Sequence, residues 1–182
     1  MYALYKTIEW GDALGEEREC FIHRTCPFST IWSKLLKDIY ISISGQASEN
    51  VAFHVYLSSE RCLGNHETIV FDTEETDIGG SYNSHDGIFD TPITGTYVFT
   101  HTLIPKFHKW VQTEIVVDGA VKGVIVADTE EAQDYHPASV TIVVNVNAGQ
   151  HVFVRRRRGS GGCDIASEFD VSYTTFSGWF LF

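Results

Sequence analysis

Residues 68–104 restrict the possible folds of this chain more than any other segment. Their sequence is TIVFDTEETDIGGSYNSHDGIFDTPITGTYVFTHTLI, which contains three short runs of alternating apolar residues separated by glycine-rich turns. The last run begins at Gly95 and places Tyr97 and Phe99 on one face. A glycine leading into alternating aromatic residues is typical of a sharp reversal followed by a strand with a buried face. The segment therefore predicts short β-strands.

The chain after residue 50 continues as a series of strands. The dipeptide Asp118-Gly119 separates VQTEIVV from AVKGVIVA, and it strongly indicates a two-residue hairpin because both central residues must tolerate positive φ. Turn signals at such short intervals, with no clear helix between them, predict an all-β sandwich. The other strands are expected at residues 51–57, 68–71, 95–104, 111–117, 140–146, 151–154 and 175–182.

The composition excludes several classes of protein. Hydrophobic residues make up 43% of the 182 residues and charged residues 20%, which fits one globular domain with an extension and excludes a disordered chain. The formal net charge of −11 argues against a nucleic-acid partner held through its phosphates. No run of about 18 apolar residues is present, so no membrane span is expected.

Four cysteines, Cys20, Cys26, Cys62 and Cys163, permit two disulfides but do not define their pairing. The spacing Cys20-x-x-His23-x-x-Cys26 offers three ligands to zinc, whereas a structural zinc site needs four. A local disulfide or free thiols is therefore the favoured interpretation.

The first 50 residues differ from the rest and are interpreted as an extension to a domain at 51–182. In the segment TIWSKLLKDIY, apolar residues from Trp32 to Ile43 lie on one face of a possible helix. This face would suit a short oligomerising stalk. A strand at 39–44 is the competing interpretation, because Ile39, Ile41 and Ile43 alternate with other residues.

Two of the expected strands are apolar on both faces. In 140–146, Val143 lies opposite the row that contains Ile142 and Val144, and in 175–182 Trp179 and Leu181 alternate with phenylalanines. One face of each strand can fill the core of a sandwich, while the other needs cover from elsewhere. We therefore expect partner subunits to cover it.

The aromatic and glycine spacing, together with VNAGQHVFV and the closing run TTFSGWFLF, resembles the globular domain of the complement C1q family over residues 51–182. The matching positions are Phe71, Asn83, Phe89, Gly95, Tyr97 and Phe99. This resemblance implies a ten-stranded jelly-roll β-sandwich of the tumour necrosis factor type that assembles as a homotrimer. No collagen-like Gly-X-Y repeat is present, so the chain is similar to the short, collagen-less invertebrate members.

The resemblance implies recognition rather than catalysis. It suggests a lectin-like protein of innate immunity that binds microbial polysaccharide or lipopolysaccharide, with trimerisation adding avidity. The alternatives are a signalling ligand of the tumour necrosis factor type and a calcium-binding matrix protein. An extracellular location is expected from the family, although the N-terminus lacks a secretory signal. A cytoplasmic location is the alternative.

Some members of the family hold calcium in the acidic loop after the hairpin. The resemblance makes Asp128 and Asp134 candidate calcium ligands, since they are carboxylates in the corresponding loop. His136 stands where a second carboxylate would be expected. A solvated acidic loop without a metal is the competing interpretation.

The run of Arg155, Arg156, Arg157 and Arg158 stands out in an acidic chain. On a strand it would place two guanidinium groups on each face, and these groups suit phosphate, sulfate or carboxylate ligands. The equally weighted alternative is neutralisation by the domain's own acidic residues. Tyr135 and His136 complete the expected ligand site. Further candidates for sugar binding are Tyr82, Asn83, Trp110 and Tyr173, each of which could equally be a packing residue.

Signals for catalysis are weak. The eight histidines show no two-histidine metal spacing on a helix, and Ser160 lacks the strand-to-helix elbow of a nucleophile. The chain is therefore not expected to be an enzyme.

Overall fold

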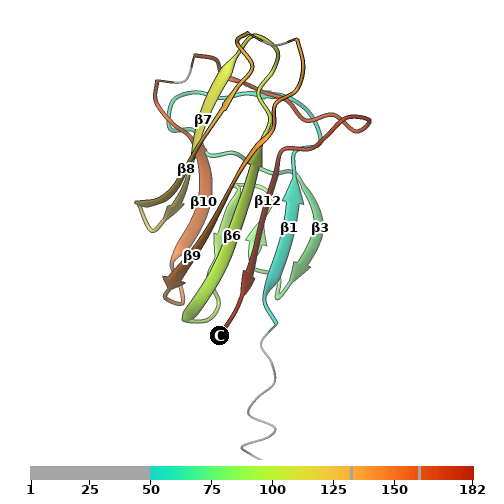
Figure 1. Ribbon diagram of the computed structural model, residues 1–182. Coiled ribbons are helices and arrows are strands. Elements are labelled where there is room, and N and C mark those ends of the chain that lie inside the picture. The colour runs from blue at the N-terminus through green and yellow to red at the C-terminus, as the bar shows by residue number, and fades with distance from the viewer. Residues whose placement is uncertain (1–49, 132, 160) are drawn as a thin grey trace, which may run out of the picture. The chain divides into compact units, whose positions relative to one another are not determined.

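A computed structural model describes residues 50–131, 133–159 and 161–182. Ten strands form two five-stranded antiparallel sheets that face each other (Figure 1). The first sheet has the order β3-β1-β12-β6-β9, with β1 at Ala52–Tyr56, β3 at Thr73–Ile78, β6 at Gly95–Leu103, β9 at Ala138–Val146 and β12 at Thr175–Phe180. The second has the order β4-β5-β10-β7-β8, with β4 at Tyr82–Asn83, β5 at Ile88–Asp90, β7 at Trp110–Val117, β8 at Ala120–Asp128 and β10 at His151–Arg156.

This arrangement confirms the predicted ten-stranded jelly-roll sandwich. A third sheet pairs the short strands β2 (Arg61–Cys62) and β11 (Asp164–Ile165). The described residues contain no helix, and hence none long and apolar enough to cross a membrane. The expected stalk at residues 29–43, the alternative strand at 39–44 and the Cys20–His23–Cys26 cluster lie outside the described residues.

The core between the sheets is largely aromatic. Phe53 of β1 stacks on Phe89 of β5 at a centroid distance of 4.8 Å and meets Phe176 of β12 edge-on at 5.0 Å. Gly178 makes room for these rings, because a Cβ atom there would lie 2.5 Å from Phe99 and 2.6 Å from Phe53. The glycine in the closing Phe-Ser-Gly-Trp run is thus required by the close packing of the core.

The predicted hairpin at Asp118-Gly119 is present between β7 and β8. Asp118 has φ 49° and Gly119 has φ 82°, so both central residues lie in the left-handed region, as a two-residue turn of this kind requires. The expected strand at 68–71 is not present. Thr68 makes only an isolated bridge to Arg155, and the strand that follows in the chain, β3, begins at Thr73.

The outer face of the first sheet carries one apolar row across all five strands. Cross-strand pairing places Ile78, Ala52, Trp179, Val98 and Val143 side by side, in that order. Val143 is 65% exposed, Ile78 50% and Trp179 39%, whereas Val98 between them is buried, so three of the five members of the row are uncovered in the single chain. The next row consists of polar residues that bond to one another, including the Nδ1 atom of His54 with the Ser177 hydroxyl at 2.6 Å.

The strand directions gather the long loops at one end of the sandwich. The described residues of the connections 57–72, 104–109, 129–131 with 133–137, and 157–159 with 161–174 all lie at the end opposite the C-terminus and the start of β1 (Figure 1). We call this the loop end. Most of the residues that the sequence predicts for the ligand and calcium sites lie at or next to this end, at the ends of β8 and β10 or in the loops that follow them: Asp128, Asp134, Tyr135, His136 and Arg155 to Arg158. Tyr82 and Asn83, on β4, do not belong to this group.

Candidate functional site at the loop end

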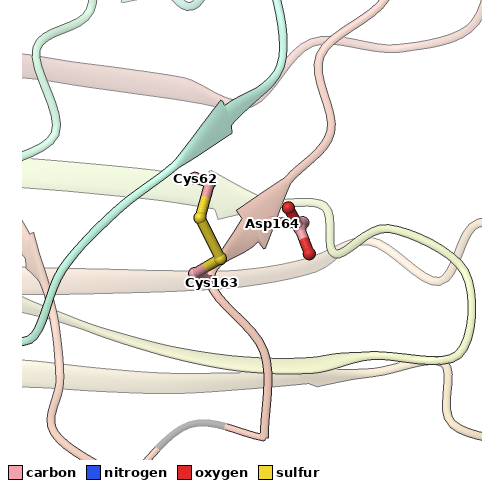
Figure 2. A group of neighbouring side chains, drawn as sticks. All are labelled: Cys62, Cys163 and Asp164. Atoms are coloured by element: carbon pink, nitrogen blue, oxygen red, sulfur yellow. A yellow bond between two sulfur atoms is a disulfide. The ribbon is translucent and has the colours of Figure 1, made fainter.

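A disulfide joins two of the loops at this end. Cys62 on β2 and Cys163, next to β11, are bonded at an S–S distance of 2.09 Å (Figure 2). The Asp164 carboxylate lies beside the two sulfur atoms, and together they form the one group of three potential metal ligands among the described residues. Since both sulfurs are bonded to each other, neither is available as a thiolate, and the group is a structural clamp rather than a metal site.

The arginine run is divided between the strand and the following loop. β10 ends at Arg156, so Arg155 and Arg156 point to opposite faces while Arg157 and Arg158 follow the strand and are exposed. Arg155 donates from Nε to the buried Glu114 carboxylate at 2.7 Å, and the Arg157 Nε lies 3.6 Å from the same carboxylate. Neutralisation by an acidic residue of the domain therefore accounts for part of the run.

Arg156 has a structural role. Its side chain is only 8% exposed in total, and its guanidinium donates to the Asn65 amide oxygen at 2.7 Å and to the Gly162 carbonyl at 2.8 Å. These bonds tie two loops, those that contain Asn65 and Gly162, to the end of β10. Among the arginines of the run, Arg158 has no hydrogen bond or ion pair to another described residue, which leaves its guanidinium the most available for a ligand.

The acidic loop surrounds an open hollow. Asp128, Glu130, Glu131 and His136 line it, together with the buried Thr129. The Asp128 carboxylate accepts a hydrogen bond from the Glu130 backbone at 2.9 Å.

The second predicted calcium ligand does not join this group. Asp134 does not line the hollow, and its carboxylate accepts a bond from the Tyr135 backbone at 2.8 Å. The described residues of this loop therefore do not bring three ligating side chains together. Asp128 and Asp134 as calcium ligands remain a prediction, and the arrangement of the described side chains does not by itself provide a calcium cage.

Tyr135 and His136 are adjacent in sequence, but their side chains lie in different surroundings. His136 faces the acidic hollow, whereas the ring of Tyr135 packs against Phe107 at a centroid distance of 4.5 Å. The Tyr135 hydroxyl donates to the Glu168 carboxylate at 2.8 Å, and this bond raises the pKa of Tyr135 above its usual range. Tyr135 thereby links the loops 129–137 and 157–174.

The other aromatic candidates have different environments. Tyr82 is buried, with its hydroxyl 3.2 Å from the Phe71 carbonyl, so it is a core residue. Asn83 is exposed on β4 and donates to Asp86. Trp110 lies at the start of β7 against Gly161, where even a Cβ atom would clash with the indole. Tyr173 is partly exposed at the loop end and stacks on Tyr56 at 4.2 Å.

Sequence reasoning missed the turn at residues 168–172. It presents Phe169 and Val171, whose side chains are 85% and 52% exposed, next to Tyr173. The signal was available in the sequence SEFDVSY, where two apolar residues alternate with acidic and polar ones. That pattern indicates a half-buried strand as readily as an exposed turn, and only the structure separates the two.

These observations define a β-sandwich whose two sheets hold a set of loops at one end. A model of the C1q domain family matches residues 52–181, and the chain belongs to this family. Human Multimerin-1 is 30% identical over 116 residues, which are 63% of this chain and 9% of that protein. The chain therefore spans only a small part of this relative's length.

Two solved structures have the same fold. The globular domain of the zebrafish complement 1qA protein superimposes with a TM-score of 0.58 at 14% identity, covering 72% of this chain and 98% of the other. The Eiger TNF from S. frugiperda superimposes with a TM-score of 0.56 at 11% identity, covering 74% and 94%. The fold is thus shared by C1q domains and tumour necrosis factor-like proteins.

Proposed function

We propose that this chain is a non-catalytic recognition protein that forms a homotrimer and binds microbial polysaccharide or lipopolysaccharide through its loop end. The observation that carries the proposal is the gathering of four loops at one end of a rigid sandwich, away from the C-terminus (Figure 1). Binding residues on loops held by a rigid scaffold are typical of recognition domains. A role in innate immunity follows as part of the same proposal.

The apolar row on the first sheet supports trimerisation. Exposed contiguous apolar surface on a soluble domain usually marks an interaction site. Ile78, Trp179 and Val143 extend this surface from one edge of the sheet to the other, away from the loop end. A trimer built on this face would leave three loop ends available, so weak single contacts would combine into avid binding.

An extracellular location is also part of the proposal. The Cys62–Cys163 disulfide supports it, because such bonds persist in oxidising compartments and are rare in the cytosol.

The experiment is a binding assay of the purified protein on a panel of microbial polysaccharides and lipopolysaccharide, with calcium and with a chelator. Loss of binding in chelator, reproduced by Asp128→Asn with Asp134→Asn, would support the calcium prediction. Binding that survives chelator, fades with salt and is lost in Arg158→Gln would support the arginine prediction. Lys122→Gln, on the exposed part of β8, is the matched control with the same charge change. No binding to any member of the panel would refute glycan recognition.

A signalling ligand of the tumour necrosis factor type is the second candidate. It is supported by the TM-score of 0.56 to the Eiger TNF structure, which is close to the 0.58 to the zebrafish complement 1qA domain. This function predicts saturable binding to one protein receptor on cells and no binding to the glycan panel. The same protein preparation can be tested in both assays, so the two functions are distinguishable.

A further inference from the structure

The loop end carries an aromatic surface that neither the core nor the apolar row uses. Phe169 is 85% exposed, Val171 52% and Phe107 43%. One exposed apolar residue on a surface is ordinary, but several that form a connected surface mark an interaction site. We call Tyr56, Phe107, Tyr135, Phe169 and Tyr173 the aromatic cluster.

The members of the cluster are connected through direct contacts. Phe107 packs on Tyr135, whose hydroxyl donates to Glu168 at the base of the 168–172 turn. Tyr135 and Val171 line the same narrow crevice. On the other side of the turn, Phe169 meets Tyr173 at a centroid distance of 6.5 Å, and Tyr173 stacks on Tyr56. The turn therefore joins two aromatic pairs into one surface.

The turn that presents Phe169 is firmly held. The backbone of Glu168 and that of Ser172 exchange two hydrogen bonds of 3.0 and 3.1 Å. Below them, the buried hydroxyl of Ser167 donates to the Leu57 carbonyl at 2.6 Å, and that of Thr174 donates to the Ala166 carbonyl at 2.8 Å. Phe169 is thus held in solvent by a preorganised turn, which reduces the entropy lost on binding.

The polar groups around the cluster are mainly carboxylates. Glu168 and Asp170 flank Phe169, and Glu60 lies near Tyr135, where it pairs with Lys106. The pKa of Tyr173 is raised, first by partial desolvation and then by Tyr56 and the carboxylates of Asp170 and Glu75. A ligand bearing phosphate or sulfate would be repelled by this surface.

We propose that the aromatic cluster is a binding site for uncharged sugar residues of a polysaccharide. The apolar C–H face of a pyranose ring can pack on Phe169 or Phe107, while its hydroxyls donate to the carboxylates of Glu168 and Asp170, which only accept. The inference rests on the proposed glycan recognition and names its site and ligand class. It assigns neutral glycans to the cluster, and leaves lipopolysaccharide to the arginine run.

The test is binding to immobilised mannan and laminarin, both uncharged, beside lipopolysaccharide and heparin, both anionic. The wild-type protein is expected to bind a neutral polysaccharide, with little change between low and high salt. Phe169→Ala and Phe107→Ala should each weaken this binding by about tenfold or more, as for exposed aromatic residues at the centre of a binding site. Val124→Ala, an exposed apolar residue on β8, should leave it unchanged.

Three results would overturn the inference. Binding to mannan or laminarin that is equally strong in the wild-type protein and in both phenylalanine variants would place the sugar site elsewhere. Binding to lipopolysaccharide alone, lost in Arg158→Gln, would refute the inference but retain the proposed function. A shift of Phe169→Ala to a smaller assembly in sedimentation velocity would show that the cluster is a subunit contact. Absence of binding to all four probes would instead refute the proposed function itself.

Discussion

At the scale of single residues, His101 makes the stability of the domain depend on pH. The ring is fully buried between the sheets, with Nδ1 2.8 Å from the Thr175 carbonyl and Nε2 3.0 Å from the Thr113 hydroxyl. Because a carbonyl only accepts, Nδ1 carries the proton and Nε2 accepts from Thr113. Burial lowers the pKa of His101 to about 4, against the raising effect of the Thr175 carbonyl.

The direction of the effect follows from proton uptake. Below the ordinary histidine pKa of about 6.5, the unfolded chain takes up a proton that the folded protein does not, until the pH approaches 4. We expect the free energy of unfolding to fall by about 2 kcal/mol between pH 7.5 and pH 5 from this residue alone. Urea titrations at both pH values measure it.

His101→Leu should be less stable at pH 7.5, because the Thr113 hydroxyl loses its partner, but should lose less stability on going to pH 5. His85→Gln, at an exposed position, should keep the wild-type pH dependence. Equal pH dependence in the wild type and His101→Leu would contradict this account.

The arginine run shows which properties of single residues the sequence can predict. Four consecutive arginines in an acidic chain indicate a need for counter-charges, and Glu114 supplies one for Arg155. The identity of that partner was not predictable, since it lies 41 residues away and is opposed to Arg155 only through the register of β7 and β10. Likewise, no local signal shows that Arg156 bonds to Asn65.

At the scale of elements, the disulfide between the β2 and β11 loops should contribute strongly to stability. It links cysteines 101 positions apart, and cross-linking a loop of this length restricts the unfolded chain considerably. We expect the double replacement Cys62→Ser with Cys163→Ser to lower the free energy of unfolding by about 2–4 kcal/mol. Denaturant titration of the variant, beside the wild type with and without reductant, measures the effect.

The reductant provides the control for the disulfide. It should destabilise the wild type to the level of the double variant and leave the double variant itself unchanged. If the wild type and the double variant unfold at the same denaturant concentration without reductant, the disulfide does not stabilise the domain.

Elements with local signals were predicted, and elements defined by distant partners were not. The hairpin at Asp118-Gly119 follows from two adjacent residues. In contrast, β3 has the sequence TEETDI and lies at the edge of its sheet, where most of its side chains face solvent. An edge strand without alternating apolar residues has the sequence pattern of a loop. The sequence therefore predicted a strand at the apolar run 68–71 instead of at β3. The pairing of Cys62 with Cys163 was equally hidden, since four cysteines allow three pairings.

At the scale of the whole molecule, the fold separates two surfaces. The apolar row crosses the outer face of the first sheet, whereas the loops and the aromatic cluster occupy one end. The expectation that strands 140–146 and 175–182 need cover on a second face agrees with the exposure of Val143 and Trp179, at 65% and 39%. A protein built this way can assemble through its sheets and keep its loop ends accessible.

Assembly through the apolar row can be tested by a single substitution that introduces a charged side chain into the row. Val143 lies at the edge strand β9 and is the most exposed member of the row, so Val143→Asp should be tolerated by the isolated chain. In a trimer this substitution would bury three unpaired carboxylates, one from each subunit, which is strongly unfavourable. We therefore expect the wild type to sediment as a trimer at micromolar concentration and Val143→Asp as a monomer with unchanged circular dichroism. Val124→Asp, at a 40% exposed position on β8 of the other sheet, should remain trimeric. A monomeric wild type would refute assembly, and a trimeric Val143→Asp would place the subunit contact on another face.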